Sequence, residues 1–334
     1  MTKIGIPRAL LYYQYYPMWQ SFCQELGVEV VISPPTTQAM LAAGASRVVA
    51  DTCLPVKVFL GHVLSLVDKC DWIFIPAIRS VETKVYNCSK FLGLPDMTKA
   101  VLPESPPILE IDIDINKGKG ELYQAINKLG RHFTRNPLKI RQARMAAWST
   151  YLNYRDLMSS QKLAPPEAIE RITGTREDKP EAAANLGHPK ATIALVGHPY
   201  LVNDEYINHR LVHRLEQAGN RVITPEMVTA DKLQSAIISL TGGAYWTYEE
   251  EVVGAGGHYL QNEADGVIGI MAFGCGPDSL MMDTVRRQAA RLRKTPFMCL
   301  TLEEHTAEAG VVTRLEAFTD MLHRKKRREA EICV

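Results

Sequence analysis

ADGVIGIMAFGCGPDSLMMD, residues 264–283, is the stretch that decides the fold we expect for this chain. Its apolar run, 267–273, predicts a buried strand, and the Gly-Cys-Gly-Pro turn that follows ends that strand. Cys275 is therefore expected at the carboxyl end of a central strand, beside a helix N-terminus. Open α/β sheets bind ligands at that edge, and this position lowers the pKa of a thiol. A lone cysteine is often only a small buried hydrophobe, but the flanking glycines indicate that something approaches closely.

Two further cysteines repeat this placement. Cys53 follows the short apolar run 48–50, which we interpret as a strand, and Pro55 lies in the first turn of the next helix. Cys88 lies on a loop just past the strand expected over 72–76. Three of the remaining cysteines are predicted to be packing residues, namely Cys23, Cys70 and Cys299. The last, Cys333, lies in the C-terminal tail.

The amino-acid composition limits the classes of protein to which this chain can belong. The chain has 334 residues, of which 46% are hydrophobic and 22% charged, which suits a globular protein of two domains. The net charge of +1 predicts no nucleic-acid partner and no membrane surface. No signal peptide or membrane span is expected, and none of the seven cysteines forms a CxxC pair. We therefore expect a cytoplasmic protein whose cysteines serve metal binding or catalysis rather than disulfides.

The two ends of the chain share one pattern, in which a strand ending in proline is followed by tyrosines, a helix, a glycine and a second strand. We interpret this as a weak internal repeat. It predicts an α/β fold of two doubly wound, Rossmann- or flavodoxin-like domains with a cluster-binding cleft between them. The expected divisions are an N-terminal domain (1–118), a helical region and linker (119–190) and a C-terminal domain (191–334).

Apolar runs and turn residues predict the individual elements. A helix is expected over 18–26, and the alternating stretch 108–115 is typical of a half-exposed or edge strand. A long helical region is broken near Pro137. After the turn at Cys275 we expect a helix over 280–292. Its predicted cap is Asp278 or Ser279. The other expected strands are 3–7, 28–32, 192–199, 221–225 and 296–302.

Three thiolates that converge on a cleft suit a soft metal centre. A cubane iron–sulfur cluster normally takes four cysteines, so three would leave one iron open to water or substrate. The alternative is zinc held by the same three cysteines together with a histidine. The spacing of Cys53, Cys88 and Cys275 matches no compact zinc module, which favours iron–sulfur. The candidate histidines for zinc are His62, His198 and His305.

Five segments resemble the superfamily of 2-hydroxyacyl-CoA dehydratase and benzoyl-CoA reductase subunits, and within it the branch associated with the activators of those enzymes. They are KIGIPRALLYY (3–13), DTCLPVKVFLGH (51–62), YNCSKFLGLPD (86–96), FGCGPDS (273–279) and EEHTAEAGVVTRLEAF (303–318).

The resemblance implies two α/β domains and a [4Fe–4S] cluster with Cys53, Cys88 and Cys275 as its ligands. It also implies an ATP-hydrolysing activase as partner, which donates a low-potential electron. The chain departs from the pattern at Ser89, where proline is expected after the second cysteine. These 334 residues contain no Walker-type loop, so we expect no fused ATPase and an activase that is a separate chain.

Three functions follow as hypotheses. The first is a radical acyl-CoA dehydratase or reductase component that acts on a small substrate at the open iron. The second is a non-catalytic electron-transfer or cluster-carrying partner of an activase, and the third is a zinc-binding protein of similar fold. For the first two we expect oxygen sensitivity, an anaerobic setting and a homo- or hetero-dimer. The charges of Arg79, Lys84 and Lys90 around the Cys88 loop are predicted to steer the activase.

Overall fold

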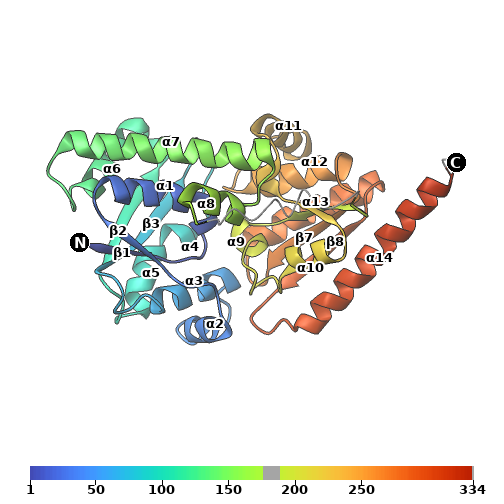
Figure 1. Ribbon diagram of the computed structural model, residues 1–334, viewed down its shortest axis with the longest axis horizontal. Helices are drawn as coiled ribbons and strands as arrows, with labels where there is room; N and C mark the ends of the chain where they lie inside the picture. Colours follow the sequence, from blue (N-terminus) through green and yellow to red (C-terminus); the bar gives the residue numbers. More distant parts are fainter. Residues whose placement is uncertain (176–188, 333–334) are drawn as a thin grey trace.

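The computed structural model describes residues 1–175 and 189–332, and these contain two four-stranded parallel sheets that lie side by side (Figure 1). Each sheet runs in the order second, first, third, fourth strand, so the two halves of the chain repeat one topology. This confirms the α/β class and the internal repeat. The strands are β1 (Lys3–Ile6), β2 (Glu29–Ile32), β3 (Trp72–Ser80), β4 (Ile108–Asp114), β5 (Thr192–Val196), β6 (Arg221–Ile223), β7 (Gly266–Ala272) and β8 (Phe297–Leu302).

Helices connect the parallel strands, as the crossover geometry requires. Those of the first sheet and the following region are α1 (Tyr12–Glu25), α2 (Gln38–Ala45), α3 (Leu54–Leu64), α4 (Ser89–Leu92), α5 (Leu94–Val101), α6 (Lys119–Gly130), α7 (Pro137–Gln161) and α8 (Pro165–Thr173). Those of the second are α9 (Pro199–Val202), α10 (Leu211–Gln217), α11 (Ala230–Thr241), α12 (Ala255–Gln261), α13 (Gly276–Leu292) and α14 (Glu308–Ile332). Short 3₁₀ turns η1 (Ile115–Lys117) and η3 (Pro225–Met227) and a π-helical turn η4 (Glu250–Gly254) complete the described elements.

Most predicted strands are confirmed, including the edge position and alternating burial of β4. The strand predicted over 48–50 is wrong, because these residues form a turn that leaves Val49 74% exposed. Helix α1 begins at Tyr12 rather than near residue 18 and contains Pro17, since its tyrosines are buried in the core and hold the helix despite the proline.

Helix α13 also begins earlier than expected. Its N-cap is Cys275 itself, with Pro277 in the first turn, so neither Asp278 nor Ser279 is the capping residue. The prediction of a break near Pro137 is confirmed, since Asn136 caps α7 by accepting the backbone N–H groups of Leu138 and Lys139. Part of the predicted linker (176–188) and Cys333 lie outside the described residues.

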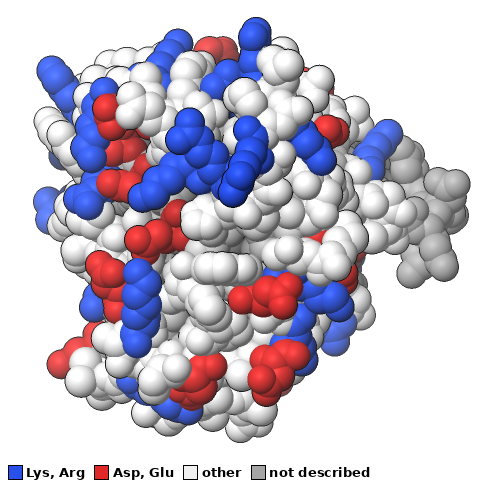
Figure 2. Space-filling view, turned by 90° about the vertical axis from the view of Figure 1, so that its left-hand side faces the viewer, with Lys and Arg blue, Asp and Glu red and all other residues white. Residues whose placement is uncertain are grey.

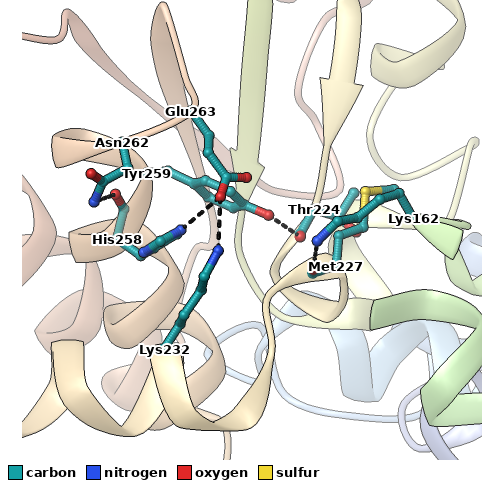
Figure 3. A network of polar contacts seen from close by, with 8 residues as sticks. All are labelled: Lys162, Thr224, Met227, Lys232, His258, Tyr259, Asn262 and Glu263. Atoms are coloured by element: carbon teal, nitrogen blue, oxygen red, sulfur yellow. Dashed lines mark hydrogen bonds and ion pairs between the residues drawn. The ribbon is translucent and has the colours of Figure 1, made fainter. Parts of the chain in front are cut away.

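Helix α7 runs along the upper side of the first half of the molecule, and its end reaches the second half (Figure 1). Tyr154 on α7 donates a hydrogen bond of 2.5 Å to the carbonyl of Tyr13 on α1. Just past its end, Lys162 donates to the carbonyl of Met227 at 2.5 Å (Figure 3). These bonds fix the helical region between the sheets, and the network continues within the second half of the chain. There Tyr259 donates to the carbonyl of Thr224.

Charge is unevenly distributed over the end of the molecule shown in Figure 2, where Lys and Arg gather in the upper half. Figure 1 places α6 and α7 on that upper side. The net charge of +1 therefore conceals a local basic region. Within the described ranges, no helix is both long and apolar enough to span a bilayer.

Candidate functional site

All three cysteines predicted as ligands lie at the start of a helix. Cys53 is the N-cap of α3, Cys275 the N-cap of α13, and Cys88 immediately precedes the short α4. None uses its side chain for a capping hydrogen bond. All three are free thiols of intermediate exposure. Each sulfur is thus available for another partner.

The structure brings these three loops near one another. Gly274 has a φ of +76°, and a Cβ built there would lie 3.6 Å from the Cα of Cys53. The Cys275 loop therefore packs on the Cys53 loop, and a side chain at position 274 would be strained. The Cys88 loop is tied to the second half by backbone hydrogen bonds, from Tyr86 N–H to the Tyr245 carbonyl and from Thr247 N–H to the Tyr86 carbonyl.

The electrostatics of the thiols reflect this proximity. Burial raises the pKa of Cys53, and the charge of Cys88 adds to the rise, whereas the Lys90 ammonium opposes it. Burial also raises the pKa of Cys275 strongly, with further contributions from the Asp278 carboxylate and from the other two cysteines. In the free protein these two thiols are held protonated, so a metal that binds thiolates would displace protons.

Backbone donors face two of the sulfurs. The backbone amides of Val56 and Asp278 partly offset the burial, since each lowers the pKa of the thiol that it faces, Cys53 and Cys275, respectively. Both amides lie in the first turn of a helix of more than ten residues, and the Val56 N–H donates to the Cys53 carbonyl at 3.1 Å. Amides in this position favour a thiolate once it forms.

A buried histidine lies beside Cys275. His198, at the carboxyl end of β5, is 3% exposed, and its Nδ1 is hydrogen-bonded to Asp278, which is fully buried. The other carboxylate oxygen of Asp278 accepts the N–H of Ala272 at 2.9 Å. The ring of Tyr200 stacks on His198 at 4.9 Å, and that of Tyr248 meets it edge-on at 5.0 Å. Asp278 therefore fixes the imidazole beside the cysteine loop.

The surroundings of Tyr248 are unusual. Its φ is +76°, its hydroxyl is buried without a hydrogen-bond partner among the described residues, and the π-helical turn η4 follows it. Positive φ in a bulky residue, a buried unpaired hydroxyl and π-helical turns all concentrate at functional sites. Burial holds the pKa of Tyr248 well above its usual value, and Cys88 is among the groups that add to this.

Of the three histidines considered as zinc ligands, His198 lies beside Cys275 with its Nδ1 engaged by Asp278, whereas His62 and His305 do not join the cysteines. His62 is fully buried between Ser33 and Thr36, with both ring nitrogens hydrogen-bonded, at 2.7 and 2.8 Å. His305 lies after β8 and lines a separate pocket of about 640 Å³. In the part of the chain that the structure describes, no three His, Cys, Asp or Glu side chains are arranged to hold a single metal ion.

That pocket lies between the two halves of the chain. Arg8, Thr36 and Asp204 are among the residues that line it. Nearby, Lys57 on α3 pairs with Glu304 after β8 at 2.5 Å, and Lys57 is only 2% exposed. Four of these contributors were not predicted from the sequence, namely Lys57, Asp204, Tyr200 and Tyr248. The one local signal would have been the position of Tyr200 two residues after His198.

No curated protein matches this chain. A family model described as CoA enzyme activase uncharacterised domain (DUF2229) matches residues 3–228. This range is more than half of the chain and includes Cys53 and Cys88, but it ends before Cys275. It agrees with the resemblance to the activase-associated branch, and the chain belongs to the family of the CoA enzyme activase uncharacterised domain.

Proposed function

We propose that this chain is a [4Fe–4S] protein that receives a low-potential electron from a separate ATP-hydrolysing activase and acts on a small substrate at the open iron. Cys53, Cys88 and Cys275 would be the three ligands, in a cleft between the two α/β halves. The observation that carries the proposal is that three free thiols, none engaged in capping, begin three helices whose loops lie together.

The donor set fits such a cluster. Each thiolate of a cubane binds a different iron, so its ligands need not converge on one point as zinc ligands do. The absence of a single-ion site among the described residues is therefore compatible with the proposal and gives no support to zinc. The amides of Val56 and Asp278, which lower the pKa of Cys53 and Cys275, would be placed to donate hydrogen bonds to the bound thiolates, and such bonds tune the reduction potential of these centres.

When bound, a cluster with one open iron supplies a Lewis acid and a one-electron carrier. The chain's own residues would prepare the site for it. Asp278 orients the His198 ring, and the rings of Tyr200 and Tyr248 cover that imidazole on two sides. These aromatic side chains are buried and exclude water, which strengthens electrostatic interactions with a bound substrate.

Iron and acid-labile sulfide measured in anaerobically purified protein test the proposal. We expect about four of each per chain in the native protein, visible absorption that bleaches in air, and a sharp loss of iron in Cys53→Ala, Cys88→Ala and Cys275→Ala. Cys23→Ala is the matched control, because Cys23 is buried in α1 and should only cost about 1–3 kcal/mol of stability.

Two results would overturn the assignment. Full iron retention in Cys275→Ala would remove that residue from the ligand set. A colourless anaerobic preparation with stoichiometric zinc would establish the zinc-binding alternative instead.

A further inference from the structure

The pocket of about 640 Å³ between the two halves of the chain has no part in the proposed function. Its walls come from loops that follow strands of both sheets. Arg8 follows β1, Pro35 and Thr36 follow β2, and the segment from Glu303 to Thr306 follows β8. The pocket therefore lies at the carboxyl edge of both parallel sheets, where open α/β folds bind ligands. Its volume falls within the range of small-molecule sites, about 300–1,000 Å³.

One cation of this pocket has no counter-charge. Arg8 is only partly exposed, and it forms no ion pair with any carboxylate of the described residues. The residue is held in place, because its backbone N–H donates to the Ser33 hydroxyl at 2.7 Å and its guanidinium lies 5.7 Å from the centre of the Tyr12 ring. A charge that is partly buried without a partner is costly, and a ligand of opposite charge would remove that cost.

Asp204 lies near Arg8 but is already engaged. Burial lowers the pKa of Arg8, and neighbouring groups, Asp204 among them, outweigh this effect. The Oδ1 atom of Asp204 accepts the N–H groups of Tyr206 and Ile207, each at 3.1 Å. Its Oδ2 atom accepts the Thr36 hydroxyl. Since these donors satisfy both carboxylate oxygens, the Arg8 guanidinium stays available to a ligand.

The other charges of the pocket limit the class of that ligand. Five carboxylates line the pocket, against two arginines and two histidines. The acids are Asp204, Glu205, Glu303, Glu304 and Glu308, and the bases are Arg8, Arg210, His209 and His305. Because like charges repel, a ligand with several negative charges, such as a nucleotide or a coenzyme A ester, is disfavoured here. A single carboxylate matches Arg8, which can bind it through two parallel hydrogen bonds.

We propose that this pocket binds a small organic monocarboxylate, with the carboxylate paired to Arg8 and the rest of the ligand against the apolar side chains of the wall. Those side chains include Leu41, Leu54 and Ile207. Leu54 directly follows Cys53, so the ligand would lie next to the Cys53 turn whether or not the cysteines hold a cluster. Binding needs only Arg8 and the walls of the pocket, so it does not depend on the proposed function.

Isothermal titration calorimetry of the full chain tests this site with hexanoate, its neutral amide hexanamide and the dianion hexyl phosphate. We expect hexanoate to bind with a Kd of about a millimolar, as is usual for a ligand of its size. Hexanamide should bind about tenfold more weakly, because it cannot form the charge-assisted pair. Hexyl phosphate should also bind about tenfold more weakly, because the surrounding carboxylates repel its second charge.

Substitution of Arg8 tests its role. Arg8→Gln should weaken hexanoate binding about tenfold and leave hexanamide binding unchanged, since only the charge-assisted pair is lost. The matched control is Arg221→Gln, because Arg221 is exposed at the start of β6 and does not line the pocket. That variant should bind hexanoate like the native chain.

Phenylglyoxal labelling of the native chain, read by peptide mass spectrometry, tests the same contact without a variant. Hexanoate should slow the labelling of Arg8 and leave that of Arg221 unchanged. If the native chain does not bind hexanoate, or binds hexanamide equally well, the proposal is wrong. Hexyl phosphate that binds more tightly than hexanoate would exclude the monocarboxylate class. Native binding in Arg8→Gln, or labelling of Arg8 that hexanoate does not slow, would also overturn the site.

Discussion

The buried polar residues under the pocket form one directed chain of hydrogen bonds. Thr36 donates its proton to the Asp204 carboxylate, so it accepts from Nε2 of His62 at 2.8 Å. In neutral His62 the other ring nitrogen, Nδ1, then accepts from the Ser33 hydroxyl at 2.7 Å, while Ser33 accepts the N–H of Arg8. Protonation of His62 would remove the acceptor of the Ser33 proton.

His62 therefore predicts that the fold loses stability in mild acid. Burial, with a smaller effect of the Arg8 charge, lowers the pKa of His62 from 6.5 to about 3. Because the folded pKa lies below the unfolded one, the unfolded chain binds the extra proton between these values, and stability falls as pH drops below 6.5. At pH 5 the loss is about 2 kcal/mol relative to pH 7.

Urea unfolding at pH 7 and pH 5 measures this loss. His62→Gln, which keeps hydrogen-bonding groups but cannot titrate, should reduce the difference between the two pH values by about 2 kcal/mol, whatever its stability at pH 7. An unchanged difference in that variant would assign the acid sensitivity to other groups.

How far the sequence predicted the site is clear from two sets of residues. Cys53 and Cys275 could be located beside helix starts because Pro55 and the glycines flanking Cys275 mark local turns, whereas Cys88 was predicted only to lie on a loop after a strand. The pairing of His198 with Asp278 joins residues eighty positions apart, and no local pattern encodes such a contact. Whether the three cysteines bind a cluster stays a prediction.

At the scale of elements, two glycines set the crossing of α2 and α3. A Cβ on Gly44 would lie 1.9 Å from the carbonyl oxygen of Lys57, and one on Gly61 would lie 2.0 Å from that of Met40. Since both contacts are with backbone, no side chain can move aside. The close crossing holds α3, and with it Cys53, against α2.

Gly44→Ala should therefore destabilise the protein by about 3 kcal/mol or more, because it forces the two helices apart. The control is Gly120→Ala on α6, where a Cβ meets nothing within 4 Å. This variant should raise the free energy of unfolding by about 0.5–1 kcal/mol, because alanine has the higher helix propensity. Denaturant midpoints of the two variants give both values. Equal effects would show that the α2–α3 contact relaxes easily.

The wrong predictions of secondary structure concern segments whose conformation is decided by tertiary contacts. The apolar residues 48–50 form a turn because Val49 has no neighbouring strand to pair with, and three residues carry too little pattern to decide. In α1, the burial of Tyr12, Tyr13 and Tyr16 outweighs the cost of Pro17 within the helix. Long apolar runs such as β7 were predicted to within a residue, because burial alone fixes them.

At the scale of the whole molecule, the two sheets are joined by an ion pair. The Lys57 ammonium, 2% exposed, donates to the Ala50 carbonyl at 2.8 Å and to Glu304 at 2.5 Å. A buried charge that loses its partner is costly, whereas replacing both members by apolar groups is much less so.

Glu304→Ala is therefore expected to lower the unfolding free energy by about 2–4 kcal/mol, less than for a fully buried pair because the Glu304 side chain is 23% exposed. The Lys57→Met/Glu304→Ala double variant should recover a large part of this loss. Glu303→Ala, at an exposed neighbouring carboxylate, should change stability by no more than about 0.5 kcal/mol. Calorimetry that finds the same melting temperature for Glu304→Ala and Glu303→Ala would contradict this role.

The approach of an activase, which rests on the proposed function, involves the surface around the Cys88 loop. Of the three charges predicted to steer it, Arg79 pairs with Asp112 at 3.0 Å, and Lys90 acts on the pKa of Cys53. Lys84 is exposed and has no ion pair in the described structure. Substitution of Lys84 therefore tests electrostatic steering of the activase without breaking an ion pair.

Lys84→Glu should slow ATP-dependent reduction by the cognate activase about threefold to tenfold at low salt, with the difference shrinking as salt screens the charge. Iron content should not change, because Lys84 is not among the groups that shift the pKa of Cys53 or Cys275. The control is Lys69→Glu, an exposed lysine before the amino end of β3, at the edge of the sheet opposite the Cys88 loop. If both variants are reduced at the native rate at low salt, the activase docks elsewhere on the molecule. If it reduces neither these variants nor the native protein, the electron-acceptor function itself is wrong.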